Sequence, residues 1–336
     1  MTSRPAPAIA LTMGEPAGIG GEIALIAWQT RPRPPAFFVI DDPARLMTLA
    51  RILGLDVPLR IIENPEDAAA VFPAALPVLA EPLLAAASPG KPDVTNAPAV
   101  IRSIERAVAL VSDGRASAVV TNPIQKATLY DAGFSYPGHT EFLAALAGLQ
   151  TPVPVMMLAC SALRVVPVTI HLALADVATQ LTTEAIVHAG RVTAAALRHD
   201  FGIFAPRLSV AGLNPHAGES GTIGRQEEDV IAPAVATLQA DGINATGPHV
   251  ADTLFHKAAR AHYDAAICMY HDQALIPIKT IDFSGGVNVT LGLPFIRTSP
   301  DHGTALDIAG TGTAGATSLL AALHLAADMA ATRASR

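Results

Sequence analysis

Short apolar runs alternate with amphipathic stretches along the first third of the chain. Apolar runs of about four to eight residues between turn-forming residues are typical of buried strands, whereas apolar residues about three or four apart indicate a helix. Val100, Ile104, Val108 and Val111 follow the helical spacing. The pattern predicts strands within residues 6–13, 37–40 and 116–120, and helices over residues 22–28, 43–53 and 98–112.

The rest of the chain continues this alternation. A Pro-rich region, 57–84, reads as irregular with short edge strands. Strands that alternate with helices define an α/β protein with a mainly parallel sheet and helices on its faces. The later strand-like runs are 164–170, 207–213 and 265–269, and the later helices are predicted at 141–147, 227–240, 253–261 and beyond residue 315.

Length and composition narrow the class of protein. A chain of 336 residues exceeds one small core, so we expect two lobes. Hydrophobic residues make up 51% of the chain and charged residues 15%, which indicates a folded globular protein. The net charge of −7 argues against nucleic-acid binding, which needs a basic surface, but it leaves an anionic small molecule open as a ligand.

The sequence also indicates a compartment. No stretch reaches the length of a membrane span, and residues 2–5 do not open a signal peptide. Cys160 and Cys268 stand in apolar surroundings, which predicts two buried thiols rather than a disulfide. We therefore expect a cytoplasmic protein with no membrane partner and no nucleic-acid partner.

A histidine follows each of three strand-like runs: His171, His216 and His271. Because parallel strands place their carboxyl ends on one edge of a sheet, the three imidazoles can converge there. Three neutral imidazoles with substrate oxygens suit a divalent metal that keeps open positions. Zinc, cobalt, manganese and magnesium all fit such a site, although nitrogen ligands favour magnesium least. A single histidine of this kind is more often structural or solvated, so the interpretation depends on the repetition.

Other polar residues stand where a ligand anion could bind. Lys279, Asn288 and Arg297 lie among apolar or Gly residues, where a polar group usually has an assigned partner. His139 and Thr140 precede a predicted helix and can face an anion at its N-terminus. The alternative is that Thr140 is the N-cap of that helix and His139 a surface residue.

Two loops and one carboxylate leave alternatives open. The turn of residues 14–21, which contains Gly14 and Glu15, lies between a strand and a helix and can present N–H groups to a phosphate. It lacks the GxGxxG dinucleotide fingerprint and is equally compatible with a simple tight turn. Residues 307–315 form a Gly-punctuated loop that can bind a nucleotide. Asp252 can face a metal or substrate, but its position favours the N-cap of the helix at 253–261.

Several motifs together resemble one family. They are GEPAGIG from Gly14, YPGHTEF, GLNPHAGE, ADTLF, MYHDQ and GVNVTLGLPFIRTSPDHGTALDIAG, and they span nearly the whole chain. They resemble the 4-hydroxythreonine-4-phosphate dehydrogenase family, enzymes of pyridoxal phosphate (vitamin B6) biosynthesis. One departure is the first loop, where Met13 and Gly21 replace prolines that are common in the family.

The resemblance implies roles for particular residues. We expect Asp252 and Lys279 to act in catalysis, because Asp252 matches the family's active-site aspartate. The positions that match the family's metal ligands are His171, His216 and His271, and those that match its substrate contacts are His139, Thr140, Lys279, Asn288 and Arg297.

The stretch HGTALDIAG is similar to the adenine-side loop of isopropylmalate and isocitrate dehydrogenases, which bind NAD without GxGxxG. This likeness implies that NAD or NADP contacts His302, Gly303 and Asp307, together with Gly14 and Glu15. It also implies a two-lobed α/β/α sandwich with the active site in the interdomain cleft, and a homodimer with a metal site shared between subunits. We place the lobes at residues 1–126 plus 283–336 and at residues 127–282.

The activity implied by the resemblance is NAD-dependent oxidation of 4-phosphohydroxy-L-threonine at its secondary hydroxyl. A divalent metal would polarise that hydroxyl and assist decarboxylation of the β-keto acid to 3-amino-2-oxopropyl phosphate. Alternatives are paralogous dehydrogenases of phosphorylated sugar acids or cyclic dihydrodiols, and a metal-binding protein without redox activity. A phosphotransacetylase-like acyltransferase is a further alternative, but it would need neither the three histidines nor the loop of residues 302–310.

Overall fold

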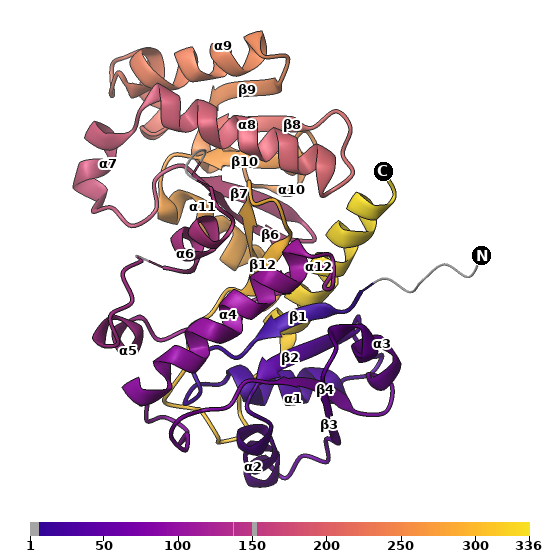
Figure 1. Cartoon of the computed structure of the whole chain (residues 1–336). Coiled ribbons are helices and arrows are strands. Elements are labelled where there is room, and N and C mark those ends of the chain that lie inside the picture. Colours follow the sequence, from indigo (N-terminus) through magenta and orange to yellow (C-terminus); the bar gives the residue numbers. More distant parts are fainter. Residues whose placement is uncertain (1–6, 137, 150–152) are drawn as a thin grey trace. The chain divides into compact units, whose positions relative to one another are not determined.

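The computed structural model describes residues 7–136, 138–149 and 153–336 (Figure 1). The chain divides into two compact units. Unit 1 comprises Met1–Gln150 with Leu293–Ala331, and unit 2 comprises Thr151–Gly292 with Thr332–Arg336. The lobes expected from the sequence had their boundaries at 126 and 283 instead.

Unit 1 contains a fully parallel run of strands in the order β3-β4-β2-β1-β5-β12. The α/β prediction is confirmed, and the region 57–84, expected to be irregular with short edge strands, supplies the edge strand β3 and its neighbour β4. The bounds are β1 (Ile9–Thr12), β2 (Phe37–Asp41), β3 (Leu59–Ile62), β4 (Leu76–Ala80), β5 (Val119–Val120) and β12 (Arg297–Pro300).

Helices of unit 1 cover this sheet. The apolar stripe predicted on α4 lies inward, with Val100, Ile104 and Val108 buried, and α4 contacts β1 and β2. The helices of this unit are α1 (Gly20–Gln29), α2 (Pro43–Leu53), α3 (Ala68–Val71), α4 (Ala97–Ser112), α5 (Lys126–Asp131), α6 (His139–Leu146) and most of α12 (Thr317–Ala334), with short 3-10 turns at η1 (Pro65–Asp67) and η2 (Val94–Asn96).

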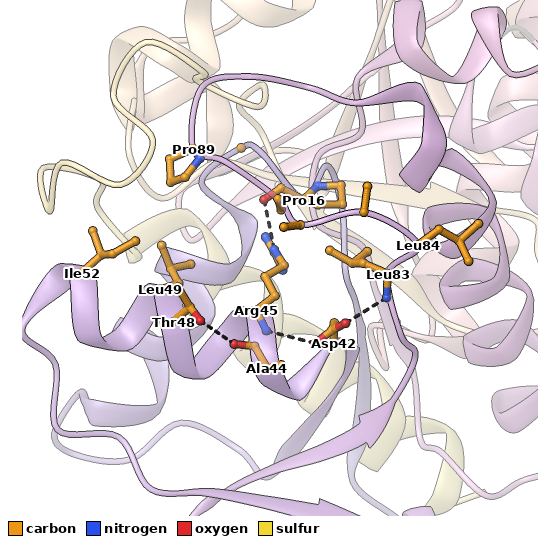
Figure 2. A pocket seen from close by; sticks show the side chains of 14 residues that line it. Pro16, Asp42, Ala44, Arg45, Thr48, Leu49, Ile52, Leu83, Leu84 and Pro89 are labelled. Carbon is orange, nitrogen blue, oxygen red and sulfur yellow. Dashed lines mark hydrogen bonds between the residues drawn. The ribbon is translucent and has the colours of Figure 1, made fainter.

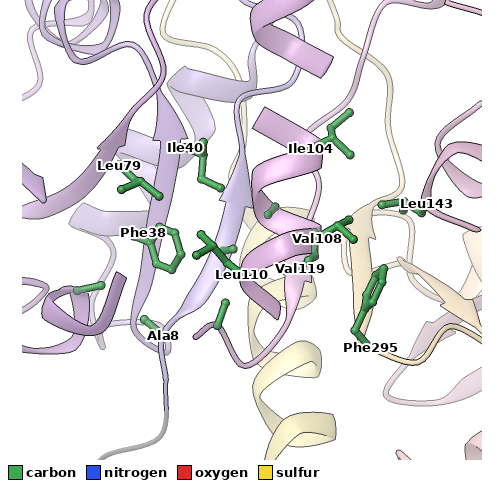
Figure 3. Close-up of a cluster of buried hydrophobic side chains, with 14 of the residues drawn as sticks. Ala8, Phe38, Ile40, Leu79, Ile104, Val108, Leu110, Val119, Leu143 and Phe295 are labelled. Atoms are coloured by element: carbon green, nitrogen blue, oxygen red, sulfur yellow. The ribbon is translucent and has the colours of Figure 1, made fainter. Parts of the chain in front are cut away.

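One hydrophobic cluster explains why α6 belongs to unit 1. Figure 3 shows Phe38 and Ile40 from β2 on one side of α4, and Leu143 from α6 with Phe295 on the other. Burial of such side chains from water is the main favourable term in folding. The packing holds α6 against α4, beyond the boundary expected at residue 126.

Unit 2 is mixed rather than fully parallel, with strands in the order β11-β6-β7-β10-β8-β9. β6 and β7 pair antiparallel because a tight turn joins them. β11 also pairs antiparallel with β6, and the remaining pairs are parallel. The bounds are β6 (Val155–Cys160), β7 (Leu163–Pro167), β8 (Arg207–Ala211), β9 (Asn244–His249), β10 (Ala265–Cys268) and β11 (Val287–Leu291).

The helices of unit 2 differ in part from the sequence prediction. The helix expected at 227–240 is a π-helical turn, η4 (Glu227–Ile231), followed by α9 (Ala232–Ala240). A helix that the apolar pattern did not predict, α11, begins directly at His271. Its bounds are His271–Ile281. The other helices and 3-10 turns are α7 (Leu174–Gln180), α8 (Thr183–His199), η3 (Pro215–Glu219), η5 (Ala251–Thr253) and α10 (Lys257–Arg260).

The cysteines are both free thiols. Cys268 is buried within β10, and burial raises the pKa of its thiol. Cys160 is only half-buried, so the prediction of two buried thiols is wrong for Cys160, which ends β6 at the turn into β7.

Among the helices of the described ranges, none is both long and apolar enough to span a bilayer.

Candidate active site

Two of the three predicted metal ligands lie together in unit 2. β7 and β10 pair in parallel, with Val165 opposite Ala266, so the residues that follow them reach the same edge of the sheet. The imidazole centres of His171 and His271 are 6.4 Å apart. The topology therefore brings this pair together as the strand pattern predicts.

His271 has a carboxylate partner on one side of its ring. Its Nδ1 lies 2.6 Å from Oδ1 of Asp272. A carboxylate at Nδ1 places the proton there and leaves Nε2 with a free lone pair, which is the usual arrangement for a metal-binding histidine. His271 is thus oriented to offer Nε2 to a cation. Asp272 follows His271 directly in the sequence, but the strand pattern predicts no role for it.

His216 is not brought to the same place within one copy of the chain. In the part of the chain that the structure describes, no group of three or more His, Cys, Asp or Glu side chains is arranged to hold a metal. His216 lies in η3 after β8 and has a left-handed backbone, with φ of 53°. The structure therefore contains the His171–His271 pair with His216 apart from it.

The loop around His216 is strained. Ala217, Glu219 and Ser220 also have positive φ, of 50°, 43° and 53°. Left-handed conformations are uncommon for non-Gly residues and cost free energy, so they persist only where the surroundings enforce them. Such strain is concentrated at functional sites.

Glu227 is the residue that holds this loop. Its side chain is buried, and its Oε1 accepts hydrogen bonds from the backbone N–H groups of Leu213 and Asn214, both at 2.7 Å. Its Oε2 accepts a third from Asn214 Nδ2 at 2.9 Å. A Cβ on Gly218 would come within 2.6 Å of Oε2, so only glycine fits there. No motif in the sequence indicates this role, because Glu227 lies in the next helical segment.

Unit 1 contains a buried cation at the predicted position Arg297. This side chain, on β12, is 4% exposed. Its Nη2 and Nε donate to Oγ1 of Thr121 at 2.6 and 3.2 Å. Burial lowers the pKa of Arg297 to about 10, so the guanidinium stays charged at neutral pH. A buried charge is stable only with compensating partners, and an anionic ligand is one such partner.

His139 contributes a neutral imidazole to the same unit. Its Nε2 is buried and has no hydrogen-bond partner among the described residues. Burial is the main cause that holds the pKa of His139 well below its ordinary value of 6.5, and the charges of Arg297 and Lys126 lower it further. A buried polar atom without a partner points to a missing ligand or water.

The helix that carries this histidine begins earlier than predicted. The N-cap of α6 is Gly138, which provides no side-chain hydrogen bond, and Thr140 is the second helical residue. The N-cap interpretation of Thr140 is therefore wrong. Since the first N–H groups of a helix have no partner within the helix, this end can accept an anion. Pro137, within the motif YPGHTEF, lies outside the described residues.

The remaining predicted substrate and catalytic residues lie in unit 2. Lys279 is on α11, with Nζ 5.5 Å from the centre of the Phe283 ring, and half-buried Asn288 is on β11. Asp252 is exposed in η5. The N-cap interpretation of Asp252 is wrong, because α10 begins at Lys257 and His256 caps it through Nδ1.

The two predicted cofactor segments are hydrogen-bonded to each other in unit 1. The backbone N–H of Ile19 donates to the carbonyl of Thr304 at 3.0 Å, and the N–H of Gly310 donates to Oε2 of buried Glu22 at 2.9 Å. A Cβ on Gly18 would come within 2.8 Å of the Thr304 carbonyl oxygen, which explains the glycine. The loop of residues 302–310 therefore rests on the turn that follows β1.

The cofactor candidates differ in accessibility. Gly303 and Asp307 are exposed, whereas Nε2 of His302 is buried without a hydrogen-bond partner among the described residues. Glu15 is buried, and its Oε1 accepts from the N–H of Ala17 at 3.0 Å. Burial raises the pKa of the Glu15 carboxyl. Gly14 has φ of 68°, and a Cβ there would lie 2.7 Å from Asn122 Cβ. Both residues therefore shape the turn.

A separate pocket of about 280 Å³ lies behind this turn (Figure 2). Arg45 crosses it, donating from Nε to the carbonyl of Pro16 at 3.0 Å and from Nη1 to both carboxylate oxygens of buried Asp41. Its walls include none of the predicted site residues. They are formed by Pro16, Gly18, Asp42, Ala44, Arg45, Thr48, Leu49, Ile52, Leu83 to Ala87 and Pro89.

One α/β unit contains buried Arg297, whose charge acts on His139, and the other contains a histidine pair at the ends of parallel strands. Together they define an α/β enzyme. A family model described as pyridoxal phosphate biosynthetic protein PdxA matches residues 34–326. The chain belongs to this family.

Individual relatives agree with the family. The chain is 56% identical to 4-hydroxythreonine-4-phosphate dehydrogenase of Bradyrhizobium diazoefficiens over 344 aligned positions, which cover 99% of this chain and 100% of that one. The crystal structure of the 4-hydroxythreonine-4-phosphate dehydrogenase of Klebsiella pneumoniae matches with a TM-score of 0.88 and 39% identity, over 96% of this chain and 99% of that one.

A third structure is more distant. The terephthalate 1,2-cis-dihydrodiol dehydrogenase of Burkholderia xenovorans matches with a TM-score of 0.64 and 29% identity, over 95% of this chain and 97% of that one.

Proposed function

We propose that this chain catalyses the NAD-dependent oxidation and decarboxylation of 4-phosphohydroxy-L-threonine to 3-amino-2-oxopropyl phosphate. Two findings support the activity: membership of the PdxA family, and 56% identity over the full length of a relative named 4-hydroxythreonine-4-phosphate dehydrogenase. The observation that carries the choice of a phosphorylated substrate is buried Arg297, charged and close enough to influence the imidazole of His139.

The phosphate binds to unit 1. Arg297 suits it because a guanidinium can donate two parallel hydrogen bonds to phosphate oxygens. His139 is neutral, so its unpartnered Nε2 carries either the proton that it donates to a phosphate oxygen or a lone pair that accepts from a protonated one. Thr140 adds a hydroxyl at the uncapped start of α6.

The His171–His271 pair, with ring centres 6.4 Å apart, would hold the divalent metal through imidazole nitrogens. When bound, the metal supplies Lewis-acid catalysis at the substrate's hydroxyl and at the oxygen that becomes negative during decarboxylation. Zinc, cobalt and manganese suit these nitrogen ligands better than magnesium does.

The third ligand, His216, comes from a second copy of the chain. Within the described residues of one copy the three histidines do not form a group. Apolar side chains beside them are exposed: Leu172 and Leu174 after His171, Ile276 on α11 and Ile223 in the loop after His216. Exposed apolar residues that cluster near functional groups mark protein interfaces. A two-fold dimer would cover them and give each subunit's pair the partner's histidine.

The reaction divides into two steps. When bound, NAD would accept a hydride from the carbon that bears the secondary hydroxyl, and the hydroxyl proton would leave to solvent or a base. The bond to the carboxylate then breaks, carbon dioxide departs, and the electron pair remains as an enolate. We assign to Lys279 the delivery of a proton to the carbon that carried the carboxylate. Asn288 orients the substrate, and Asp252 acts beside the metal ligands.

NAD or NADP binds along the loop of residues 302–310. Exposed Gly303 and Asp307, with His302, supply the contacts, and Gly14 and Glu15 act indirectly by shaping the turn on which the loop rests. The protein positions the dinucleotide, and hydride transfer is chemistry of the cofactor itself.

A comparison of substrates tests this proposal. The purified chain with NAD and each divalent metal is given 4-phosphohydroxythreonine, a phosphorylated sugar acid or a cyclic dihydrodiol, and NADH absorbance is followed. We expect turnover with 4-phosphohydroxythreonine at a kcat/KM at least about a hundredfold above the others, the loss expected when a site built for a group lacks it. Preference for a cyclic dihydrodiol would overturn the proposal in favour of that activity.

A further inference from the structure

Lys126 is an exposed cation next to the anion-binding residues of unit 1. It is the first residue of α5 and was not among the site residues expected from the sequence. Within the described residues it forms no ion pair within 4.0 Å. Its Nζ lies against Gly138, because a Cβ at that glycine would be 3.5 Å from Nζ and 3.6 Å from Cε.

Because Nζ of Lys126 lies against Gly138, the ammonium is at the start of α6. Gly138 is the N-cap of α6 and leaves the first N–H groups of the helix without a side-chain acceptor. His139 follows directly, with Nε2 buried and unpartnered among the described residues. The charges of Arg297 and Lys126 add to burial in lowering the pKa of His139, in keeping with the position of Lys126 against Gly138.

The two cations differ in a way that matters for recognition. Arg297 is buried and fixed on Thr121, so its position is set before a ligand arrives. Lys126 is exposed on a flexible side chain, so it can move onto a ligand. One carboxylate is close: Oε2 of exposed Glu141 would be 3.3 Å from the same Cβ at Gly138. It lies in the first turn of α6 and is screened by solvent.

We propose that Lys126 is a substrate-binding residue that sets the preference of this site for a phosphate dianion over singly charged anions. The inference rests on the proposed function. A phosphate monoester carries a charge of about −1.5 to −2 at pH 7, whereas a carboxylate carries one negative charge. Arg297 alone neutralises a single charge, and His139 adds none because it is neutral. Lys126 supplies the second positive charge that a dianion needs.

The test uses Lys126→Met in the full chain, with Lys126→Arg as the conservative variant and Lys91→Met as a surface control. For Lys126→Met we expect KM for 4-phosphohydroxythreonine to rise about tenfold or more, the loss expected for one charge-assisted hydrogen bond, with kcat changed little. Lys126→Arg and Lys91→Met should stay near wild type. The KM measured with unphosphorylated 4-hydroxythreonine at high concentration should be unchanged in every variant.

Binding of inorganic phosphate gives a readout without turnover. The imidazole signal of His139, identified by its loss in His139→Gln, is followed by NMR while phosphate is added, with singly charged acetate as the comparison. We expect saturable shifts with phosphate in the wild type, weakened about tenfold in Lys126→Met, and little response to acetate.

The outcomes separate the two proposals. An equal phosphate affinity in wild type and Lys126→Met, or no phosphate binding at all, would overturn the role of Lys126. An equal rise of KM for phosphorylated and unphosphorylated substrates would overturn it too, because that result indicates a structural defect. Phosphate binding that depends on Lys126 in a protein without turnover would support the role of Lys126 while the proposed reaction fails.

Discussion

Oε1 of Glu227 accepts a hydrogen bond from the backbone nitrogen of Asn214 at 2.7 Å, two residues before His216. The same carboxylate binds Leu213 N and Asn214 Nδ2, so one buried side chain fixes the entry to a loop whose backbone is left-handed. A histidine on a strained loop keeps its position only if something holds the loop in place. In this chain that group is Glu227.

Replacement of Glu227 by alanine should therefore destabilise unit 2 and weaken metal binding. The backbone N–H groups of Leu213 and Asn214 lose their acceptor, while Asn214 Nδ2 keeps Oε1 of Gln226, and an unsatisfied group costs about 1–3 kcal/mol. We expect a loss of at least about 2 kcal/mol in denaturant unfolding and a metal affinity lower by about ten- to a hundredfold, the range for groups that orient ligands. The matched control is Glu228→Ala, an exposed neighbour paired only with Arg225 at 3.5 Å. Equal metal affinities in the two variants would contradict the role of Glu227.

A shared metal site predicts complementation between two inactive variants. His171→Ala and His216→Ala should each be inactive alone, while exposed His262→Ala should behave as wild type. In a dimer of one His171→Ala and one His216→Ala subunit, one of the two sites has all its ligands. Random exchange of equal amounts should therefore restore about a quarter of wild-type activity. If subunit exchange is verified and activity still does not recover, all three ligands lie within one subunit.

The low pKa of His139 predicts a pH-dependent stability with a definite sign. Its folded pKa lies well below 6.5, so below that pH the unfolded chain takes up a proton that the folded chain does not. Stability is then lost as pH falls from about 6.5 toward the folded pKa, whereas above about 7 the group has no effect. Replacing His139 by Gln should flatten the melting temperature between about pH 7 and 5. His324→Gln, at an exposed position of α12, should keep the wild-type slope, and identical slopes in both variants would count against a neutral His139.

The strand pattern predicted part of this site because it depends on local sequence. β7 and β10 end before His171 and His271, and their parallel pairing brings the two imidazoles together. His216 follows β8, which also pairs with β10. Its position escaped prediction because non-Gly residues 216 and 217 adopt left-handed conformations that local propensity disfavours.

Other parts of the site depend on contacts between distant residues. Thr140 has the residue type of an N-cap, but the N-cap of α6 lies two residues earlier, at Gly138. Lys126 is an unremarkable surface lysine until the packing of α6 on α4 places Gly138 beside it. Glu227 reads as an ordinary helix start until its hydrogen bonds to residues 213 and 214 are seen. Sequence spacing contains none of this information.

The most direct measurement of the central claim is reduction of NAD with 4-phosphohydroxythreonine before and after a chelator removes divalent metal. We expect NADH absorbance to rise with metal present, to stop after chelation, and to return when zinc, cobalt or manganese is added back. Carbon dioxide should be released in equal amount to NADH. NADH formation at an unchanged rate after chelation would contradict the role of the histidines as metal ligands. If no NADH forms with metal and substrate present, the proposed function itself is contradicted.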